Sequence, residues 1–255
     1  MHAPIDLADS VADVFARIRS RAPRVHCITN SVAQQYTANM LLAAGAVPSM
    51  TLSPDEIGAF VTGADALLVN LGTFDAERKS AIDVALASAA EHNVPWLLDP
   101  VFIERSPARA QFARDLIGRS PAVVRLNGAE FAALTGNEPK ADAASRFAQS
   151  QATIVALTGA TDVVADGQRR TEIGNGHALM SRVTAMGCAG SALVSAALAV
   201  ETDAYVATVA ALAAFGVAGE IAAHSAQGPG SFAFAIIDAL HNLDRAEIRA
   251  RLKAS

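Results

Sequence analysis

The chain has 255 residues, of which 52% are hydrophobic and only 5% aromatic, and this suits one large α/β domain with ample material for a core. A formal net charge of -5 without a basic cluster argues against nucleic acid or an anionic membrane surface as a partner. Two distant cysteines, Cys27 and Cys188, predict neither a disulfide framework nor a cysteine metal site, and a reducing cytoplasm is the expected compartment.

The first half of the chain alternates between helices and apolar strands. Residues Asp6–Arg21 have helical periodicity instead of the continuous apolar run of a signal peptide. Asn30 is expected to cap a helix that ends at Gly45. The continuously apolar run Ala66–Asn70 is typical of a strand buried on both faces of a parallel sheet. The remaining elements are expected as strands over 24–28, 47–51 and 96–98, a short helix opened by 53–56, and helices over 76–92 and 108–117.

The second half continues the alternation and ends in helices. We expect strands over 123–126 and 153–157, and helices over 129–134 and 141–149. Asp166-Gly167 lies between two short apolar runs and predicts a hairpin. The Ala-rich run Tyr205–Ala218 is typical of a buried helix rather than a membrane span. Because strands and helices alternate without a repeat or linker, the sequence predicts one domain over 1–255, with a mostly parallel sheet covered by helices on both faces.

Residues Arg182–Ala192 are the most informative segment. Small residues flank a predicted helix start, whose unpaired N–H groups and positive dipole end form a potential phosphate site. Cys188 lies in the first turn, and a thiol placed there is expected to ionise more easily than a free one. The alternative is an ordinary glycine-containing turn that packs a buried helix, with Cys188 as a small apolar residue. Taken alone, this segment slightly favours the alternative.

Further polar residues follow the predicted strands, where ligands bind in open α/β sheets. Each has a structural alternative: Asp99 precedes a proline, Asn127 and Glu130 have the spacing of a capping box, and Thr158 precedes a glycine. Together they describe a crevice with two carboxylates, Asp99 and Glu130, opposite the predicted anion hole. Carboxylates beside phosphates are the usual ligands of Mg²⁺, so the pattern indicates phosphoryl transfer.

In order and spacing, ten short segments resemble the hydroxyethylthiazole kinase family over nearly the whole chain. The segments are Val25–Asn30, Thr37–Asn39, Gly45–Met50, Leu71–Thr73, Trp96–Val101, Arg125–Glu130, Ala156–Gly159, Asn175–His177, Val183–Cys188 and Gly228–Phe232. The resemblance implies a three-layer ribokinase-like fold and phosphorylation of the primary hydroxyl of hydroxyethylthiazole in thiamine salvage, with ATP and Mg²⁺. It also implies a homotrimer with the thiazole site near a subunit interface.

The resemblance further implies roles for individual residues. Cys188 matches the family cysteine that stands in place of the aspartate base of ribokinase-like enzymes, and the backbone of Ala185, Met186, Gly187 and Cys188 matches the anion hole. The other matches are Arg125 and Thr158 for ATP, Asp99 and Glu130 for Mg²⁺, and Met50, Asn30 and Ala185 for the thiazole. A free thiol is a poor base at neutral pH, but a loose phosphoryl-transfer transition state tolerates a weak one.

Several departures from the family pattern leave the substrate open. Ala185-Met186 stands where the family usually has Gly-Thr or Gly-Ala, and Leu126 replaces a small residue. Phe102–Arg105 replaces a glycine-rich stretch, in a loop that we expect near the active site. The alternatives are therefore a kinase for another small alcohol, or a non-catalytic regulator that binds a nucleotide or thiazole. The joint presence of Asp99, Glu130, Gly187 and Cys188 argues against the regulator.

Overall fold

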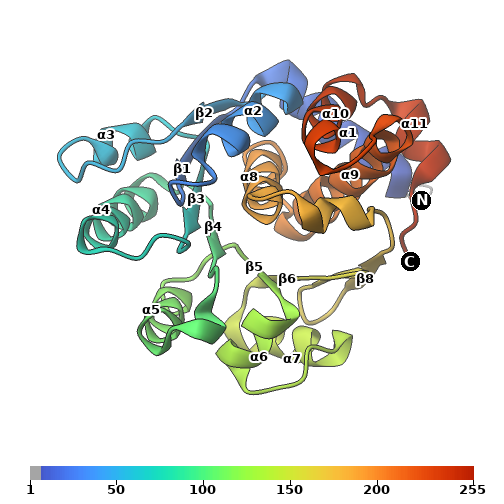
Figure 1. Ribbon diagram of the computed structural model, residues 1–255. Helices are drawn as coiled ribbons and strands as arrows, with labels where there is room; N and C mark the ends of the chain where they lie inside the picture. The colour runs from blue at the N-terminus through green and yellow to red at the C-terminus, as the bar shows by residue number, and fades with distance from the viewer. Residues whose placement is uncertain (1–6) are drawn as a thin grey trace, which may run out of the picture.

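An eight-stranded sheet runs through the middle of the computed structural model, which describes residues 7–255 (Figure 1). Asp6, where we expected the first helix to begin, lies outside the described residues. The strand order is β2-β1-β3-β4-β5-β6-β7-β8; the pairs from β2 to β6 are parallel and the last two are antiparallel. The strands are β1 Arg24–Ile28, β2 Val47–Ser49, β3 Ala66–Asn70, β4 Trp96–Asp99, β5 Val123–Asn127, β6 Ile154–Thr158, β7 Asp162–Ala165 and β8 Arg170–Ile173.

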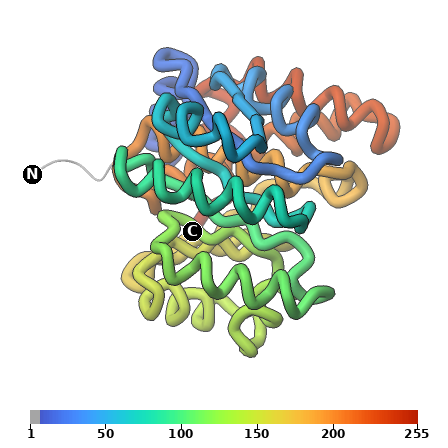
Figure 2. Tube along the Cα trace, turned by 90° about the vertical axis from the view of Figure 1, so that its left-hand side faces the viewer, coloured from blue at the N-terminus to red at the C-terminus, as the bar shows by residue number. Residues whose placement is uncertain are grey.

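Helices cover both faces of the sheet, so the predicted mostly parallel α/β fold is confirmed (Figures 1 and 2). One apolar core lies between the sheet and α1 Leu7–Arg21, α2 Gln34–Ala44, α8 Met186–Leu198, α9 Ala204–Ser225, α10 Pro229–Asn242 and α11 Arg245–Arg251. A second core lies between the opposite face and α3 Ile57–Thr62, α4 Ala76–His92, α5 Pro107–Ile117, α6 Gly128–Thr135 and α7 Ala141–Gln151. Two short 3₁₀ helices, Ile103–Arg105 and Ala178–Arg182, were not predicted.

Local signals in the sequence explain several boundaries. Asp75 caps α4 by accepting a hydrogen bond from the Arg78 N–H, and Gly45 ends α2 with a φ of 96°, a backbone conformation that favours glycine. Asp166-Gly167 joins the antiparallel strands β7 and β8, as predicted. The long apolar helix α9 is a core helix, because 78% of its most apolar window is buried inside the molecule.

The prediction that Asn30 caps a helix is wrong. The helix begins at Gln34, after a turn over residues 31–33, and its N-cap residue Ala33 makes no side-chain cap. Asn30 Oδ1 accepts a hydrogen bond from the Ala33 N–H at 3.0 Å and shapes that turn instead. Its amide nitrogen is left to point toward residues of other elements, Asn70 and Cys188.

The parallel register brings polar strand ends together at one edge of the sheet. Asn70 at the end of β3 pairs with Asp99 at the end of β4, and Asn127 at the end of β5 pairs with Thr158 at the end of β6. Helix α8 packs against β1, β3 and β4, and its N-terminus lies beside this edge (Figure 1). The fold thus places a helix start opposite the carboxyl ends of four strands.

Candidate active site

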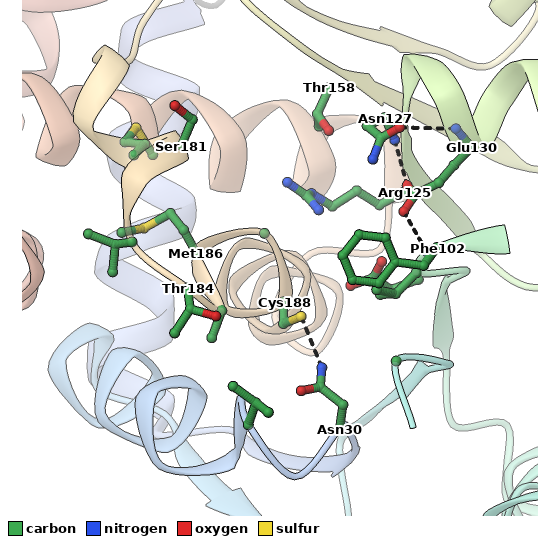
Figure 3. A pocket seen from close by; sticks show the side chains of 18 of the residues that line it. Asn30, Phe102, Arg125, Asn127, Glu130, Thr158, Ser181, Thr184, Met186 and Cys188 are labelled. Atoms are coloured by element: carbon green, nitrogen blue, oxygen red, sulfur yellow. Dashed lines mark hydrogen bonds between the residues drawn. The ribbon is translucent and has the colours of Figure 1, made fainter. Parts of the chain in front are cut away.

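A cavity of about 590 Å³ lies between the start of α8 and the carboxyl ends of the strands. Ten of the residues that line it are labelled in Figure 3. The structure brings nine of the ten predicted site residues to this cavity: Asn30, Asp99, Arg125, Glu130, Thr158, Ala185, Met186, Gly187 and Cys188. Met50 is the exception; it follows β2, is partly buried and packs against the core on the α8 side of the sheet.

The start of α8 has the form of an anion site. Ala185 is the N-cap residue, with a left-handed backbone (φ 66°, ψ 0°) and no side-chain cap, and the helix begins at Met186. The first N–H groups of a helix lack partners within the helix, and the N-cap residue Ala185 has no side-chain oxygen to accept from them. These donors and the positive end of the helix dipole border the cavity, which favours a bound anion.

Arg125 extends from β5 across the floor of the cavity to this helix start (Figure 3). Its Nε is buried without a hydrogen-bond partner, and Nη1 makes one long hydrogen bond, 3.4 Å, to Ser191 Oγ. The guanidinium lies against Gly187, where a Cβ atom would stand 3.4 Å from Nη1. A partly buried cation with so few partners is electrostatically unsatisfied, and an anion at the helix start would supply what it lacks.

A second cavity of about 580 Å³ lies on the other side of Arg125. It reaches past Asp162 and His177 to the middle of α9 at Leu212 and Phe215. The two cavities share six lining residues, Arg125, Thr158, Met180, Ser181, Met186 and Gly187. Arg125 and the start of α8 therefore border both cavities.

Asp99 is held by neighbouring donors through one of its oxygens only. Its side chain is buried, and Oδ2 accepts hydrogen bonds from Asn70 Nδ2 at 2.7 Å and from Ser191 Oγ at 2.8 Å. Within residues 7–255, Oδ1 has no hydrogen-bond partner and remains available to a ligand. Burial raises the pKa of Asp99, while Arg125, Ser191 and Asn70 act in the opposite direction.

Glu130 both caps a helix and faces the cavity. The Asn127 side chain accepts hydrogen bonds from the Ala129 and Glu130 N–H groups, and Glu130 Oε2 accepts from the Asn127 N–H at 2.8 Å, which confirms the capping box. Its Oε1 accepts from the Phe102 N–H at 3.0 Å and so ties down the turn after β4. Burial, followed by the nearby charge of Asp99, raises the pKa of Glu130 to about 7.

The two carboxylates fit a magnesium ion that arrives with a phosphate. Among residues 7–255 no group of three or more His, Cys, Asp or Glu side chains could form a metal cage. Asp99 Oδ1 is available, and each Glu130 oxygen keeps a lone pair after accepting one N–H. Mg²⁺ is usually held by one or two carboxylates together with phosphate oxygens and water, so a dedicated protein cage is not required.

Cys188 faces the cavity from the first turn of α8. Asn30 Nδ2 donates to Cys188 Sγ at 3.3 Å (Figure 3). It also donates to Asn70 Oδ1 at 3.1 Å, which links the thiol to the Asp99 network. The prediction that this thiol ionises easily is wrong. Burial, together with the nearby Asp99 carboxylate, raises the pKa of Cys188 to about 11, since both disfavour a second negative charge. The thiol is therefore neutral at pH 7.

Sequence reasoning missed one contributor to the site and the backbone conformation of another. Ser191 lies one helical turn after Gly187, and its spacing on the same face could have connected it to the anion hole. The loop Phe102–Arg105 was expected near the active site, and the structure confirms this, because Phe102 presents its ring to the cavity (Figure 3). Its left-handed backbone (φ 57°) was not predicted, and the residue is 51% exposed. Nothing in local propensity predicts that conformation for a phenylalanine.

Comparisons with known proteins agree on one family. The model of the hydroxyethylthiazole kinase family matches residues 15–246. A probable hydroxyethylthiazole kinase from Agrobacterium fabrum is 42% identical over 249 residues (97% of this chain, 96% of the relative), and a hydroxyethylthiazole kinase from Rhizobium etli is 44% identical over 252 residues (93% and 98%).

Solved structures give the same picture for the fold. A hydroxyethylthiazole kinase protein from Pyrococcus horikoshii OT3 superimposes with a TM-score of 0.93 at 36% identity, covering 97% of this chain and 98% of that one. A ribokinase-like superfamily protein from Enterococcus faecalis V583 superimposes with a TM-score of 0.68 at 11% identity, covering 96% and 92%. At that identity the second match shows the fold alone, which is the ribokinase-like fold expected from the sequence.

Proposed function

Because this chain belongs to the hydroxyethylthiazole kinase family, we propose that it transfers the γ-phosphoryl group of ATP to the primary hydroxyl of hydroxyethylthiazole, in thiamine salvage. One observation carries the proposal: an uncapped helix start, an under-bonded arginine and two buried carboxylates face the same cavity. Positive groups would hold the polyphosphate while carboxylates hold its cation. Stabilisation of spread negative charge is the main requirement of phosphoryl transfer.

The two cavities that Arg125 borders suit a nucleotide in one and an acceptor in the other. The polyphosphate would lie where the two cavities share lining residues, beside Arg125, Thr158 and the N–H groups of Ala185–Cys188. The nucleoside would occupy the second cavity, which runs on toward α9, and the acceptor alcohol would occupy the first. In this arrangement the γ-phosphate faces the acceptor hydroxyl across the start of α8, and the product is a phosphate ester with ADP and a released proton.

Asp99 and Glu130 would hold the Mg²⁺ that accompanies the nucleotide. When bound, the ion would neutralise phosphate charge and orient the polyphosphate. Asp99 contributes the free Oδ1, while Asn70 and Ser191 fix its other oxygen. Glu130 contributes a carboxylate whose position is set by two backbone N–H groups, so neither side chain has to be ordered when the nucleotide arrives.

Cys188 would receive the proton of the acceptor hydroxyl. With a pKa of about 11 only a small fraction is thiolate at neutral pH, and the help that it gives is correspondingly modest. Asn30 donates to Cys188 Sγ and so favours the ionised form against burial and Asp99. A loose transition state needs little proton removal before the phosphoryl group has moved, which makes a weakly populated base sufficient.

We expect Asn30, Ala185 and Met50 to contact the thiazole. The position of Met50 requires that a second subunit take part in this contact. Asn30 and Ala185 line the cavity, but Met50 of the same chain does not. We propose that Met50 from a neighbouring copy completes the thiazole pocket in a homotrimer, working in the cytoplasm, with each chain as one domain. Light scattering combined with activity measurement tests this arrangement: a fully active monomer would exclude a shared site.

A substrate panel tests the proposed reaction. The purified chain is incubated with Mg²⁺, ATP and hydroxyethylthiazole, and ADP and the phosphate ester are quantified together. Equal amounts of both products support the kinase. ATP consumption without ester, or ester formation only from another alcohol, would overturn the thiazole as acceptor, while absence of any turnover would leave only a binding protein.

One observation favours a second candidate, a kinase for another small alcohol. The half-exposed ring of Phe102 lines the acceptor cavity where the family pattern has glycine-rich sequence. The guanidinium carbon of Arg105 lies 5.3 Å from the centre of this ring, so the turn adds both apolar surface and a charge beside the acceptor. The same panel separates the candidates through their relative kcat/KM values.

A further inference from the structure

Ser191 lies behind the cavity wall at the point where the charged side chains come closest. It is fully buried on α8, one helical turn after Gly187. A buried serine in a helix usually donates back to the carbonyl four residues earlier, and here Gly187 O lies 3.3 Å from Ser191 Oγ. Asp99 Oδ2 is nearer, at 2.8 Å. Because a hydroxyl has one hydrogen, the shorter and charge-assisted bond to the carboxylate is the one it makes.

The same hydroxyl oxygen also faces Arg125. Arg125 Nη1 donates to Ser191 Oγ at 3.4 Å, so the hydroxyl accepts from a cation and donates to an anion. Within the described residues Arg125 and Asp99 form no direct salt bridge, although the charge of Arg125 is close enough to lower the pKa of Asp99. An Arg–Asp contact in a buried site would be strong and would satisfy both groups with each other. The serine oxygen occupies the place where that contact would form.

We infer that Ser191 is a positioning residue that keeps Arg125 and Asp99 from pairing, so that Arg125 stays available to the nucleotide phosphates and Asp99 Oδ1 to their cation. The inference rests on the proposed function for the identity of the ligand. The inference gives the hydroxyl a role beyond packing. Without the hydroxyl, Arg125 and Asp99 form a direct salt bridge, and Arg125 no longer contacts the phosphates. The effect acts through Arg125 and Asp99, since Ser191 itself does not line the cavity.

Ser195 provides a matched control on the same helix. It is also fully buried, lies one turn further along α8, and donates only to the backbone carbonyl of Ser191 at 3.1 Å. Replacement of Ser195 with alanine removes a buried hydroxyl from the same helix, together with its hydrogen bond to a backbone carbonyl. Within residues 7–255 the Ser195 hydroxyl makes no hydrogen bond to a charged side chain. The Ser195 variant therefore loses a similar amount of packing to the Ser191 variant, but Ser191 still separates Arg125 from Asp99.

The test is the affinity for ADP, measured by calorimetry on the full chain with EDTA present, so that neither turnover nor metal contributes. Ser191→Ala should weaken ADP binding by about tenfold, the order expected when a phosphate loses one charge-assisted contact, while Ser195→Ala should stay within about twofold. Ser191→Cys, which keeps the size but donates poorly, should fall between the two and covers the case in which the alanine variant does not fold.

A double-mutant cycle then separates positioning from packing. In Asp99→Asn the carboxylate that would capture Arg125 is gone, so the addition of Ser191→Ala should change ADP affinity by no more than about twofold. A similar loss with and without Asp99, or unchanged ADP binding in both Ser191 variants, would overturn the inference. Wild-type protein that binds ADP but does not phosphorylate the thiazole alcohol would remove the proposed function and leave the role of Ser191 standing; failure to bind ADP at all would remove both.

Discussion

Two regions that face the same cavity are built in opposite ways. The polar network Asn30–Asn70–Asp99–Ser191–Arg125 is joined by hydrogen bonds of 2.7 to 3.4 Å, and Asn70, Asp99 and Ser191 are buried. The turn Phe102–Arg105 begins only three residues after Asp99, yet Phe102 is 51% exposed and has a left-handed backbone, and the side chain of Arg105 is 77% exposed.

The difference separates the residues that support phosphoryl transfer from the residues that set the acceptor preference. Charged groups that stabilise a transition state have to be held before the reaction, and burial with hydrogen bonds from neighbouring side chains achieves this. An exposed turn can change its residues at little cost to the core, and this turn is one of the places where we expected the chain to depart from its family pattern. We therefore expect substitutions in the network to lower the rate for every acceptor, and substitutions in the turn to change which acceptor is preferred.

The network makes the strongest prediction. Asp99→Asn keeps the shape and the hydrogen bond from Ser191 but removes the charge, so kcat should fall about 10²–10³-fold, the usual loss for one preorganised electrostatic group. Steady-state kinetics at saturating and at low Mg²⁺ measure this, and the loss should be larger at low Mg²⁺. Asp142→Asn is the control, because Asp142 is exposed and pairs with Arg170 on the surface. Unchanged kcat in Asp99→Asn at low Mg²⁺ would refute the metal assignment.

Cys188 should matter less than Asp99. Because its thiol is mostly neutral, Cys188→Ala should lower kcat by about 10²-fold, the low end of general-base effects. Cys188→Asp should equal or exceed the wild type, since a carboxylate beside the Asn30 donor ionises more readily than this thiol.

The pH profile and a second cysteine control this result. For the wild type, kcat should keep rising with pH toward the thiol pKa of about 11, and Cys188→Asp should lose that limb. Cys27→Ala changes a fully buried cysteine in β1 that lines neither cavity, so its kcat should stay near the wild-type value. Equal rates and equal pH profiles in Cys188→Ala and the wild type would show that the thiol only packs.

Glu130 should give the enzyme a pH dependence near neutrality. Its folded pKa of about 7 lies above the ordinary value of 4.5, so the folded state favours the protonated form. The contribution of Glu130 to stability is therefore fully present below pH 4.5 and is lost as the pH rises through about 7. Cation binding needs the ionised form, so kcat/KM for ATP should fall about tenfold per pH unit below this pKa.

Glu130→Gln checks both parts of that prediction. The variant should have a lower but flat kcat/KM between pH 5 and pH 8, and the melting temperature of the wild type should fall relative to that of the variant as the pH rises. Glu138→Gln is the control, because Glu138 is exposed and pairs with Lys140. A variant that retains the wild-type limb would mean that another group, Asp99 among them, titrates in this range.

The fold could be predicted because its signals are local. Parallel strands buried on both faces are continuously apolar, so 66–70 and the strand that ends at Asp99 were found from the sequence, and α4 was found with both of its ends. The polar residues at the strand ends were found for the same reason, since parallel strands bring their carboxyl ends to one edge.

The features that sequence analysis missed arise from contacts between residues that are far apart in the sequence. The pKa of Cys188 rises because burial and Asp99, which lies 89 positions earlier in the chain, outweigh the helix start that sequence reasoning relied on. Ser191 acquires a role only because β4 and β5 place Asp99 and Arg125 on either side of it. Phe102 adopts a left-handed backbone because its N–H is held by Glu130, a tertiary contact that overrides propensity.

The turn should affect acceptor choice more than rate. Phe102→Ala removes the ring but keeps a side chain in the left-handed region, whereas Phe102→Gly also relieves the backbone. Both should change the ratio of kcat/KM between hydroxyethylthiazole and other alcohols in the same direction by about 10-fold, the usual value of a few buried carbon atoms. Phe234→Ala, an exposed phenylalanine on α10, is the control. Unchanged ratios in both Phe102 variants would show that the ring faces solvent without contacting the acceptor.

The smallest effect is expected at Ala185, which shares with Phe102 of the turn a left-handed backbone without glycine. Ala185 (φ 66°) starts the anion hole, and replacement with glycine removes the clash of its Cβ, worth about 1 kcal/mol, at some cost in unfolded-state entropy. Ala185→Gly should therefore raise the melting temperature by about 2–4 °C, with kcat within about twofold because the N–H donors stay in place. Ala152→Gly at the end of α7 (φ 49°) is the matched control, and Ala152 lines neither cavity.

A higher melting temperature for Ala152→Gly but not for Ala185→Gly would mean that the methyl group of Ala185 contributes packing at the empty site. A large gain in kcat for Ala185→Gly would mean that this methyl group obstructs the phosphate. Only the expected pair of results, greater stability with an unchanged rate, shows that the strain at the anion hole lowers the stability of the fold without contributing to the reaction.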